Sequence, residues 1–427
     1  MKNPRIFFGW YIVGASVLLM IYHAGAMIYG FTAFIEPISL TFGWTYTQIS
    51  IAMSLRGLES GVLEPLWGIL VDRWPARRLA FMGVTLYGLG FLFVSQATGL
   101  AMFYAGFIIV GAGSSLGISM LPQATIARWF KRHLGKASGI LYMGVGVGGA
   151  LVPFLVIMID RLGWQTTLGF LALGAWIMGL PLSFLFRTRP EEYGLLPDGK
   201  KQTDLKGPGR SAAYDFDTSV KEALKMRAFW HIGIASMLQM IALSALVTHI
   251  MPYFASIGME RSVAATFTMC FPLVSLAVRL PFGWFSDIFK KKYMMALSLG
   301  LVSVGLFFFH LLGHDFLSLT VPFIIIGGFG SGGMMPIRTP IIREYFGTKN
   351  FGKIYGLSHL FMTSAILIGA PLAGWVYDTS GTYDPIWLVF SVANMIGAII
   401  ILFTPLPSRS MAINDSQMTP ATGNGDR

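Results

Sequence analysis

Arg279 is the residue whose type and position most clearly point to chemistry. It lies inside the apolar stretch 262–287, which is long enough to cross a hydrocarbon core of about 30 Å as a helix. A guanidinium stays protonated at any physiological pH, so Arg279 is a permanent cation in a predicted membrane span. Snorkelling or a helix-bundling ion pair are the alternatives, but Arg279 precedes Asp287 by about 12 Å of helix. We therefore expect an inward-facing arginine that binds an anion.

Histidine, tyrosine and methionine side chains in other apolar stretches are further candidates. An imidazole at His249 could hydrogen-bond a substrate or carry a proton near neutral pH, or it could be held by a backbone carbonyl. His359, in the eleventh apolar stretch, carries the same imidazole group and could act in the same ways. Tyr22 and Met27 lie in the first stretch, and we count them as substrate-binding candidates, although such side chains more often serve packing.

Three charged residues fall within the second apolar stretch. Arg56 and Glu59 are three residues apart and can pair on one helix face. Glu64 lies four residues before a glycine that recurs in a second copy, where Arg279 holds the equivalent place. Glu59 and Glu64 are candidates for proton coupling. The alternative, a static network of the three charges, is favoured because charges in membranes usually pair.

The composition indicates a polytopic membrane protein rather than a soluble globule. Of the 427 residues, 54% are hydrophobic and only 12% are charged. The single cysteine, Cys270, excludes an intrachain disulfide and a CxxC metal site. The net charge of +11 comes from residues between apolar stretches, so we expect no nucleic-acid partner. Twelve membrane-spanning helices are predicted, at about 9–37, 47–71, 79–98, 101–126, 137–159, 164–186, 229–254, 262–286, 293–313, 316–341, 353–377 and 385–404.

The distribution of lysine and arginine predicts the topology. Of the 31 such residues, 26 lie on the side that bears both chain ends. Because basic residues gather on the cytoplasmic side of a membrane, we expect both termini in the cytoplasm and the protein in the inner membrane of the cell. The polar segment between spans six and seven reads as a linker, with a short amphipathic helix capped by Thr218 or Ser219. The expected parts are a six-helix bundle at 1–186, a cytoplasmic linker at 187–227, a second bundle at 228–404 and a disordered tail at 405–427.

The two bundles repeat the same landmarks at offsets of 214–217 residues. Such an offset implies two parallel six-helix repeats, with the substrate site near the midplane between them and rocking of the halves as the transport motion. The matched landmarks are Gly68-x3-Asp72 with Gly283-x3-Asp287, Arg77-Arg78 with Lys291-Lys292, Pro37 and Gly43 with Pro252 and Gly258, Gly111 and Phe130 with Gly327 and Phe346, and Gly135-Lys136-x2-Gly139 with Gly352-Lys353-x2-Gly356.

The motif at 68–78 resembles the signature loop between spans two and three of the major facilitator superfamily. An aspartate there can accept hydrogen bonds from a neighbouring helix end, and the arginines can hold the cytoplasmic face shut by charge pairing. The motif could also serve topology alone. A gate contact is likewise expected for Arg338, near the cytoplasmic end of span ten. The candidate gating residues are Asp72, Arg73, Arg77, Arg78, Asp287, Lys291 and Arg338.

A narrower resemblance begins at Trp129. The run 129–139, WFKRHLGKASG, with Gly144 following, is similar to the fifth-span signature of the monocarboxylate transporter family, and Gly9-Trp10 resembles part of its first-span signature. Arg279 then falls where that family has its carboxylate-binding arginine. The resemblance implies a bacterial monocarboxylate transporter, related to the oxalate–formate exchangers.

The sequence also departs from that family. Ser275 stands where animal members have a proton-coupling aspartate, and it is counted among the substrate-binding candidates. Residues 26–29 contain no lysine, which animal members have in span one. The region of Met362 lacks the second cation of oxalate exchangers, which favours a monoanion.

These patterns lead to one expected function. We expect an all-α carrier, without a cofactor, that moves a small monocarboxylate such as L-lactate or pyruvate together with a proton by alternating access across the lipid bilayer. An oxalate–formate type of exchanger or an efflux carrier for an organic acid is the alternative. No metal-ligand cluster or nucleophile–base pair suggests an enzyme, and no large soluble domain suggests a sensor.

Overall fold

The structure is a computed structural model that describes residues 7–199, 218–312 and 317–405. Helices make up almost all of these ranges, and the predicted all-α fold is confirmed. Eleven of the described helical stretches are long and apolar enough to cross a membrane. One further long helix, α3 (Tyr46–Arg73), carries the charged residues Arg56, Glu59 and Glu64. Its 28 residues span about 42 Å, so it too is long enough to cross the bilayer.

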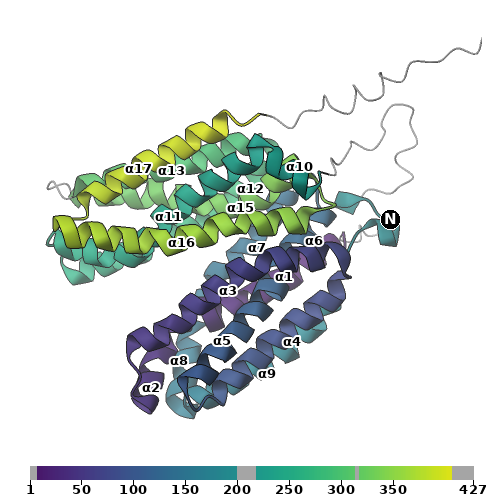
Figure 1. The fold of residues 1–427 in the computed structure, drawn as a ribbon, viewed down its shortest axis with the longest axis horizontal. Helices are drawn as coiled ribbons and strands as arrows, with labels where there is room; N and C mark the ends of the chain where they lie inside the picture. The colour runs from purple at the N-terminus through teal and green to yellow at the C-terminus, as the bar shows by residue number, and fades with distance from the viewer. Residues whose placement is uncertain (1–6, 200–217, 313–316, 406–427) are drawn as a thin grey trace, which may run out of the picture.

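The first six long helical stretches form one bundle (Figure 1). Three of them are broken into consecutive helices, because a π-helical segment or a short turn interrupts the ladder of hydrogen bonds. The elements are α1 (Gly9–His23), η1 (Ala24–Ile28), α2 (Thr32–Phe42), α3, α4 (Ala76–Ser95), α5 (Leu100–Ser114), η2 (Ser115–Met120), α6 (Leu121–Trp129), α7 (Leu134–Gly149), α8 (Val152–Leu162) and α9 (Trp164–Ser183).

The second bundle repeats this arrangement. Short turns η3 (Glu191–Tyr193) and η4 (Pro197–Gly199) follow the first bundle. The elements of the second are α11 (Arg227–Ser256), α12 (Arg261–Ile288), α13 (Lys291–Leu311), η7 (Leu317–Leu319), α14 (Thr320–Pro322), η8 (Phe323–Gly327), α15 (Gly328–Phe346), α16 (Phe351–Ser380) and α17 (Asp384–Leu402).

The predicted amphipathic helix between the bundles is present as α10 (Val220–Lys225). Ser219 is its N-cap: the Ser219 hydroxyl accepts a hydrogen bond from the amide of Glu222, and the Glu222 carboxylate accepts one from the amide of Ser219. This reciprocal pair is a capping box, which explains why so short a helix begins where it does.

The two bundles lie against each other at the end where the chain starts and diverge towards the other end (Figure 1). We call the closed end the terminal face. Phe7 packs there against Phe130, and Lys292 donates a hydrogen bond to the carbonyl of Thr404, so both described chain ends lie at this face.

Two helix crossings bring the backbones of the halves into direct contact. At the crossing of α3 and α16, a Cβ on Gly68 would lie 2.2 Å from the carbonyl oxygen of Gly352. At the crossing of α12 and α7, a Cβ on Gly283 would lie 2.3 Å from the carbonyl oxygen of Gly135. Only glycine permits such an approach. The crossings are equivalent in the sequence repeat, and together they set the distance between the halves.

The π-helical segments were not predicted from the sequence. They lie within the first, fourth and tenth long stretches, at η1, η2 and η8. A π turn inserts one extra residue into a helix and changes which side chains face its neighbours, and such turns are frequent at functional sites. Met27 lies within η1, and Tyr29 follows it directly.

Candidate functional site

The guanidinium of Arg279 lies at the contact between the halves. Arg279 projects from α12 towards α7 of the other bundle, where its Nη1 donates a hydrogen bond of 2.7 Å to the carbonyl oxygen of Tyr142. Its Nε is buried and has no hydrogen-bond partner among the described residues. Within the same residues, no carboxylate forms an ion pair with Arg279. A fixed positive charge with unused donors in an apolar setting is suited to binding an anion.

Three spans supply the surroundings of Arg279. Tyr29 and Tyr142 lie within electrostatic reach of the guanidinium. Tyr29 is 36% exposed. Ser275 lies one turn before Arg279 and is buried against Gly332 of α15. Spans one, five and eight therefore converge at this point.

The two other candidates of the first span face different ways. Met27 is buried, with 1% of its surface exposed, in the hydrophobic core. The hydroxyl of Tyr22 donates a hydrogen bond to the carbonyl of Leu171, on α9 of the same bundle. The structure thus directs Tyr22 towards α9 rather than towards Arg279.

His249 is held on both sides of its ring. Nδ1 lies 3.1 Å from the hydroxyl of Tyr383, and Nε2 lies 2.9 Å from the carbonyl oxygen of Ala370. Burial raises the pKa of the Tyr383 hydroxyl, which therefore keeps its proton and can donate it to Nδ1. Nε2 then donates to Ala370. In this arrangement His249 is the satisfied histidine that the sequence offered as an alternative.

Glu64 meets His359 across the interface between the halves. Oε2 of Glu64, on α3, lies 2.8 Å from Nδ1 of His359, on α16. The two atoms are close, and they form an ion pair when the imidazole is protonated, but they are not aligned as a regular hydrogen bond. The Glu64 side chain is only 2% exposed. The side chains of Arg56 and Glu59 lie outside the described residues, so the predicted network of the three charges stays a prediction.

A buried polar network joins α6 and α7 to α15 and α16. The amide of Gln123 donates to the hydroxyl of Tyr142, and the hydroxyl of Thr339 donates to the side-chain oxygen of Gln123. The hydroxyls of Tyr142 and Tyr355 are also hydrogen-bonded to each other. Sequence reasoning missed these residues. Helical spacing held one clue, since Tyr142 lies three residues after Gly139 of the signature run and so shares its helix face.

Arg338 belongs to the same buried region. Its Nη2 donates a hydrogen bond of 3.0 Å to the hydroxyl of Ser358, and its guanidinium lies 4.3 Å from the ring centre of Tyr355. The Arg338 residue is 3% exposed. These partners lie in its own half, and Tyr355 links it to Tyr142 of the other.

Asp72 fastens the end of α3 to the start of α16. Its carboxylate accepts hydrogen bonds from the amides of Gly352 and Lys353, at 3.0 and 3.1 Å, and from Nη2 of Arg128 at 2.9 Å. The amides at a helix N-terminus have no partner in their own helix, and the helix dipole adds a favourable interaction with the negative charge.

Asp287 makes the equivalent contact at the end of α12. Its carboxylate accepts hydrogen bonds from the amides of Gly135 and Lys136 at the start of α7, at 2.6 and 2.8 Å. We call the contacts of Asp72 and Asp287 with these amides the two latches. Each joins one half to the other at the terminal face.

Among the described residues, the contacts found for two of the basic motif residues lie within one half. Arg77 donates a hydrogen bond to the carbonyl of Phe184, and Nζ of Lys291 lies 2.5 Å from the carboxylate of Glu344. Both partners belong to the same half as the basic residue. Arg73 and Arg78 are exposed. Charge pairing of the basic residues across the interface therefore stays a prediction, while the aspartates bind backbone amides of the other half.

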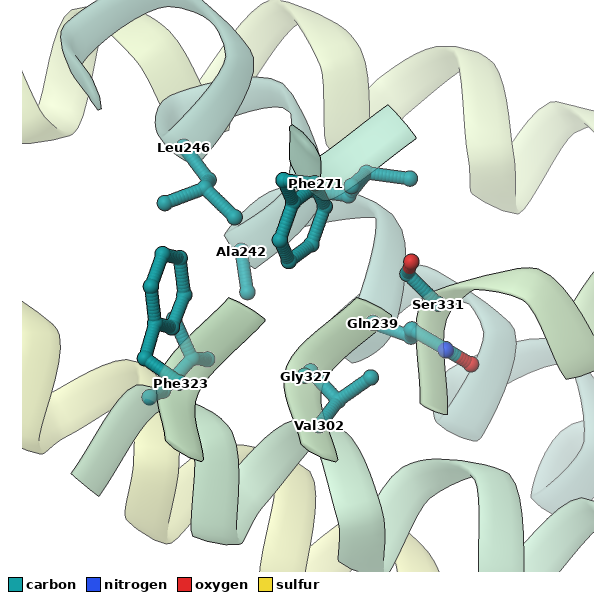
Figure 2. A pocket seen from close by; sticks show the side chains of 10 residues that line it. Gln239, Ala242, Leu246, Phe271, Val302, Phe323, Gly327 and Ser331 are labelled. Carbon is teal, nitrogen blue, oxygen red and sulfur yellow. The ribbon is translucent and has the colours of Figure 1, made fainter. Parts of the chain in front are cut away.

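A small cavity lies inside the second bundle, next to Phe271 and Phe323 (Figure 2). Its volume of about 10 Å³ matches one water molecule. Gln239 reaches its wall, and Oε1 of this residue has no hydrogen-bond partner among the described residues. The cavity is too small for a carboxylate of three carbons, and all its lining residues belong to one half.

Comparison with protein families gives one match that spans the chain. The family model described as Major Facilitator Superfamily matches residues 15–270 and 250–422. Among curated proteins, monocarboxylate transporter 12 of Mus musculus is 23% identical over 423 residues, which cover 94% of this chain and 86% of that protein. Monocarboxylate transporter 2 of Homo sapiens is 24% identical over 408 residues, covering 89% and 82%.

Solved structures with this fold include two transporters. The proton:xylose symporter XylE bound to 6-bromo-6-deoxy-D-glucose has a TM-score of 0.72 and 13% identity, covering 93% of this chain and 96% of that one. A bacterial homologue of the iron transporter ferroportin, in an outward-facing state, has a TM-score of 0.71 and 15% identity, covering 92% and 98%. At these identities the similarity concerns the fold alone.

Proposed function

Because the chain belongs to the major facilitator superfamily and is related to the monocarboxylate transporters, we propose that it carries a small monocarboxylate together with a proton. L-lactate and pyruvate are the substrates that we expect. The two halves would alternate in exposing a central site to each side of the membrane. We further propose that the terminal face is cytoplasmic and that the membrane is the inner membrane of the cell, on the distribution of basic residues.

The observation that carries this proposal is the guanidinium of Arg279. Its planar fork can bind a carboxylate through two parallel hydrogen bonds. Its present partner, the Tyr142 carbonyl, belongs to the other half. A carboxylate that replaced this contact would therefore couple occupancy of the site to the packing of α12 on α7.

The charge around the site favours a monoanion. Met362 is buried at the place where an oxalate-type exchanger would need its second cation. Arg338, another buried guanidinium, already donates to Ser358 and to Tyr355. An exchanger of oxalate and formate, or an efflux carrier for an organic acid, is the second candidate. Glu59 and Glu64 are the proposed candidates for the coupled proton, because both ring nitrogens of His249 already have partners in its own half.

Uptake of radiolabelled L-lactate into proteoliposomes, with and without an inward proton gradient, tests the proposal. We expect acid-driven uptake in the wild type, impaired uptake in Arg279→Lys and none in Arg279→Ala, because lysine keeps the charge but loses the two-point fork. Arg161→Lys is the matched control, since Arg161 is an exposed arginine at the end of α8. Normal uptake by a correctly inserted Arg279→Ala protein would remove Arg279 from the mechanism. Counterflow driven by oxalate rather than lactate would favour the exchanger.

A further inference from the structure

We infer that the pair formed by Glu64 and His359 carries the coupled proton, holding it between the halves while the terminal face is closed and releasing it when the halves part. This inference rests on the proposed function and assigns its proton to one site. The carboxylate and the imidazole lie 2.8 Å apart, one on each half. Two titratable groups at that distance are coupled, so the pair can hold one proton on either member, as a carboxylate beside an imidazolium or as a neutral acid beside a neutral imidazole.

The repeat of the chain makes this pair the counterpart of the Arg279–Tyr142 contact. Glu64 and Arg279 each lie four residues before the glycine of the aspartate motif, on α3 and α12. His359 and Tyr142 each lie three residues after the glycine that ends the matched Gly-Lys-x2-Gly run, on α16 and α7. The two interfaces thus have the same construction with opposite charge. One presents a cation for the substrate anion, and the other presents a carboxylate and an imidazole for a proton.

The packing of α3 on α16 makes the pair depend on the state of the carrier. A Cβ on Gly356 would lie 2.6 Å from the carbonyl oxygen of Glu64, so the two backbones are in contact beside the pair. The latch of Asp72 closes the same crossing nearer to the terminal face. Opening that face requires α3 and α16 to separate. Separation parts Glu64 from His359, and the site that held the proton ceases to exist.

The surroundings of His249, by contrast, do not depend on how the two halves are arranged. Its two partners, Tyr383 and Ala370, lie in the same half as His249 itself. A rocking motion of the halves leaves those contacts in place. His249 therefore keeps the same surroundings on both sides of the cycle, whereas His359 gains and loses a carboxylate.

Among the residues that the structure describes, the pair has few other charged or titratable neighbours. Tyr355 of α16 lies within electrostatic reach of Glu64, and the guanidinium of Arg338 from α15 covers the Tyr355 ring. Tyr142 of α7 is hydrogen-bonded to Tyr355. On α3 itself the chain has Arg56 and Glu59, whose side chains lie outside the described residues. Arg338 supplies a fixed positive charge, so the proton is the component of this cluster that changes during the cycle.

The transport step that follows is electrically balanced. One proton from the opposite face joins the pair, and one monocarboxylate anion binds Arg279, so the loaded carrier moves no net charge. When α3 and α16 separate, the proton passes from the pair to water at the terminal face and the anion leaves Arg279. No redox partner or cofactor takes part.

Acid-driven accumulation and exchange, measured on the same proteoliposomes, test the inference. A gradient of one pH unit drives about tenfold accumulation of a monoanion in one-to-one symport. We expect Glu64→Gln and His359→Gln to lose this accumulation while counterflow of labelled against unlabelled L-lactate continues. His231→Gln is the matched control and should accumulate substrate as the wild type does, because His231, whose Nδ1 lies 3.1 Å from the Thr404 hydroxyl, belongs to no proposed site. Recovery of accumulation in the swapped variant, Glu64→His with His359→Glu, would support a shared proton.

The outcomes separate this inference from the proposed function. If the wild type neither accumulates nor exchanges L-lactate, pyruvate or another monocarboxylate, the proposed function fails. If the wild type does both, and either glutamine variant still accumulates substrate with the wild-type dependence on pH, the proton is carried elsewhere and only this inference fails. Should Glu64→Gln not insert into the membrane, His359→Gln decides alone, because the His359 side chain is less deeply buried, at 22% exposed against 2%.

Discussion

Replacement of Gly68 by alanine should open the terminal face. The added Cβ would lie 2.2 Å from the carbonyl oxygen of Gly352, 2.5 Å from its carbonyl carbon and 2.9 Å from the amide nitrogen of Lys353. All three are backbone atoms of the other half, so no side chain can rotate to make room. The two helices must instead move apart by roughly 1 Å to reach an acceptable contact.

The size of the effect follows from where the clash occurs. Overpacking of this kind costs about 1–3 kcal/mol. The cost falls on the closed terminal face alone, because Gly68 and Gly352 separate when that face opens. A difference of about 1–3 kcal/mol between two states shifts their ratio by about 5–150-fold. Gly283→Ala should act in the same direction, since its Cβ would lie 2.3 Å from the carbonyl oxygen of Gly135.

Distances between spin labels at Arg132 and Lys290 provide the assay. Both residues are exposed at the terminal face, one in each half, and Cys270→Ala gives a background without other thiols. We expect the population of long distances to grow in Gly68→Ala and Gly283→Ala. Gly300→Ala is the matched control, because a Cβ on this glycine of α13 would meet no atom within 4 Å. An unchanged distance distribution in both correctly inserted variants would refute the idea that these crossings set the closed state.

Three further predictions concern the latches, His249 and α10. Asp72→Asn and Asp287→Asn should slow counterflow more than they weaken equilibrium binding of labelled L-lactate, because both latches lie at helix ends remote from Arg279; a sharp loss of affinity at an unchanged exchange rate would contradict this. His249→Gln should lower the free energy of unfolding of the purified protein by about 1 kcal/mol for each hydrogen bond lost, and it should leave acid-driven uptake intact. Loss of the pH dependence of uptake in this variant would return His249 to the mechanism. Ser219→Ala should destabilise α10 by about 1 kcal/mol, because the helix loses its N-cap. The amide hydrogens of residues 220–225 should then exchange faster while uptake stays normal, and an unchanged exchange rate would argue against the capping box.

The fold could be predicted because its signals are local. Apolar runs long enough to span a bilayer and the recurring glycine and aspartate landmarks indicated the all-α repeat that the structure has. The helix at 220–225 was predictable from its amphipathic pattern and its N-cap. The aspartate motif even suggested carboxylates that bind helix ends, as Asp72 and Asp287 do.

The side-chain contacts of the site depend on information that no local pattern carries. Glu64 and His359 meet across separate halves, and only the packing of α3 on α16 brings them together. The direction of Tyr22 depends on how α1 is rotated, and a helix that is apolar on most faces leaves that rotation undetermined. The π turns at η1, η2 and η8 change the phase of their helices without a sequence signature.

The two latches have a consequence for how this chain can change over evolutionary time. Asp72 and Asp287 recognise main-chain amides, so closure of the terminal face does not depend on which side chains stand at positions 136 and 353. Almost any residue supplies the same N–H, and only proline removes it. Positions 136 and 353 can therefore vary, and the two halves can diverge there while still fitting together. Positions 135 and 352 must stay glycine, because an added Cβ would lie 2.1 Å from the carbonyl oxygen of Gly283 or 2.5 Å from that of Gly68.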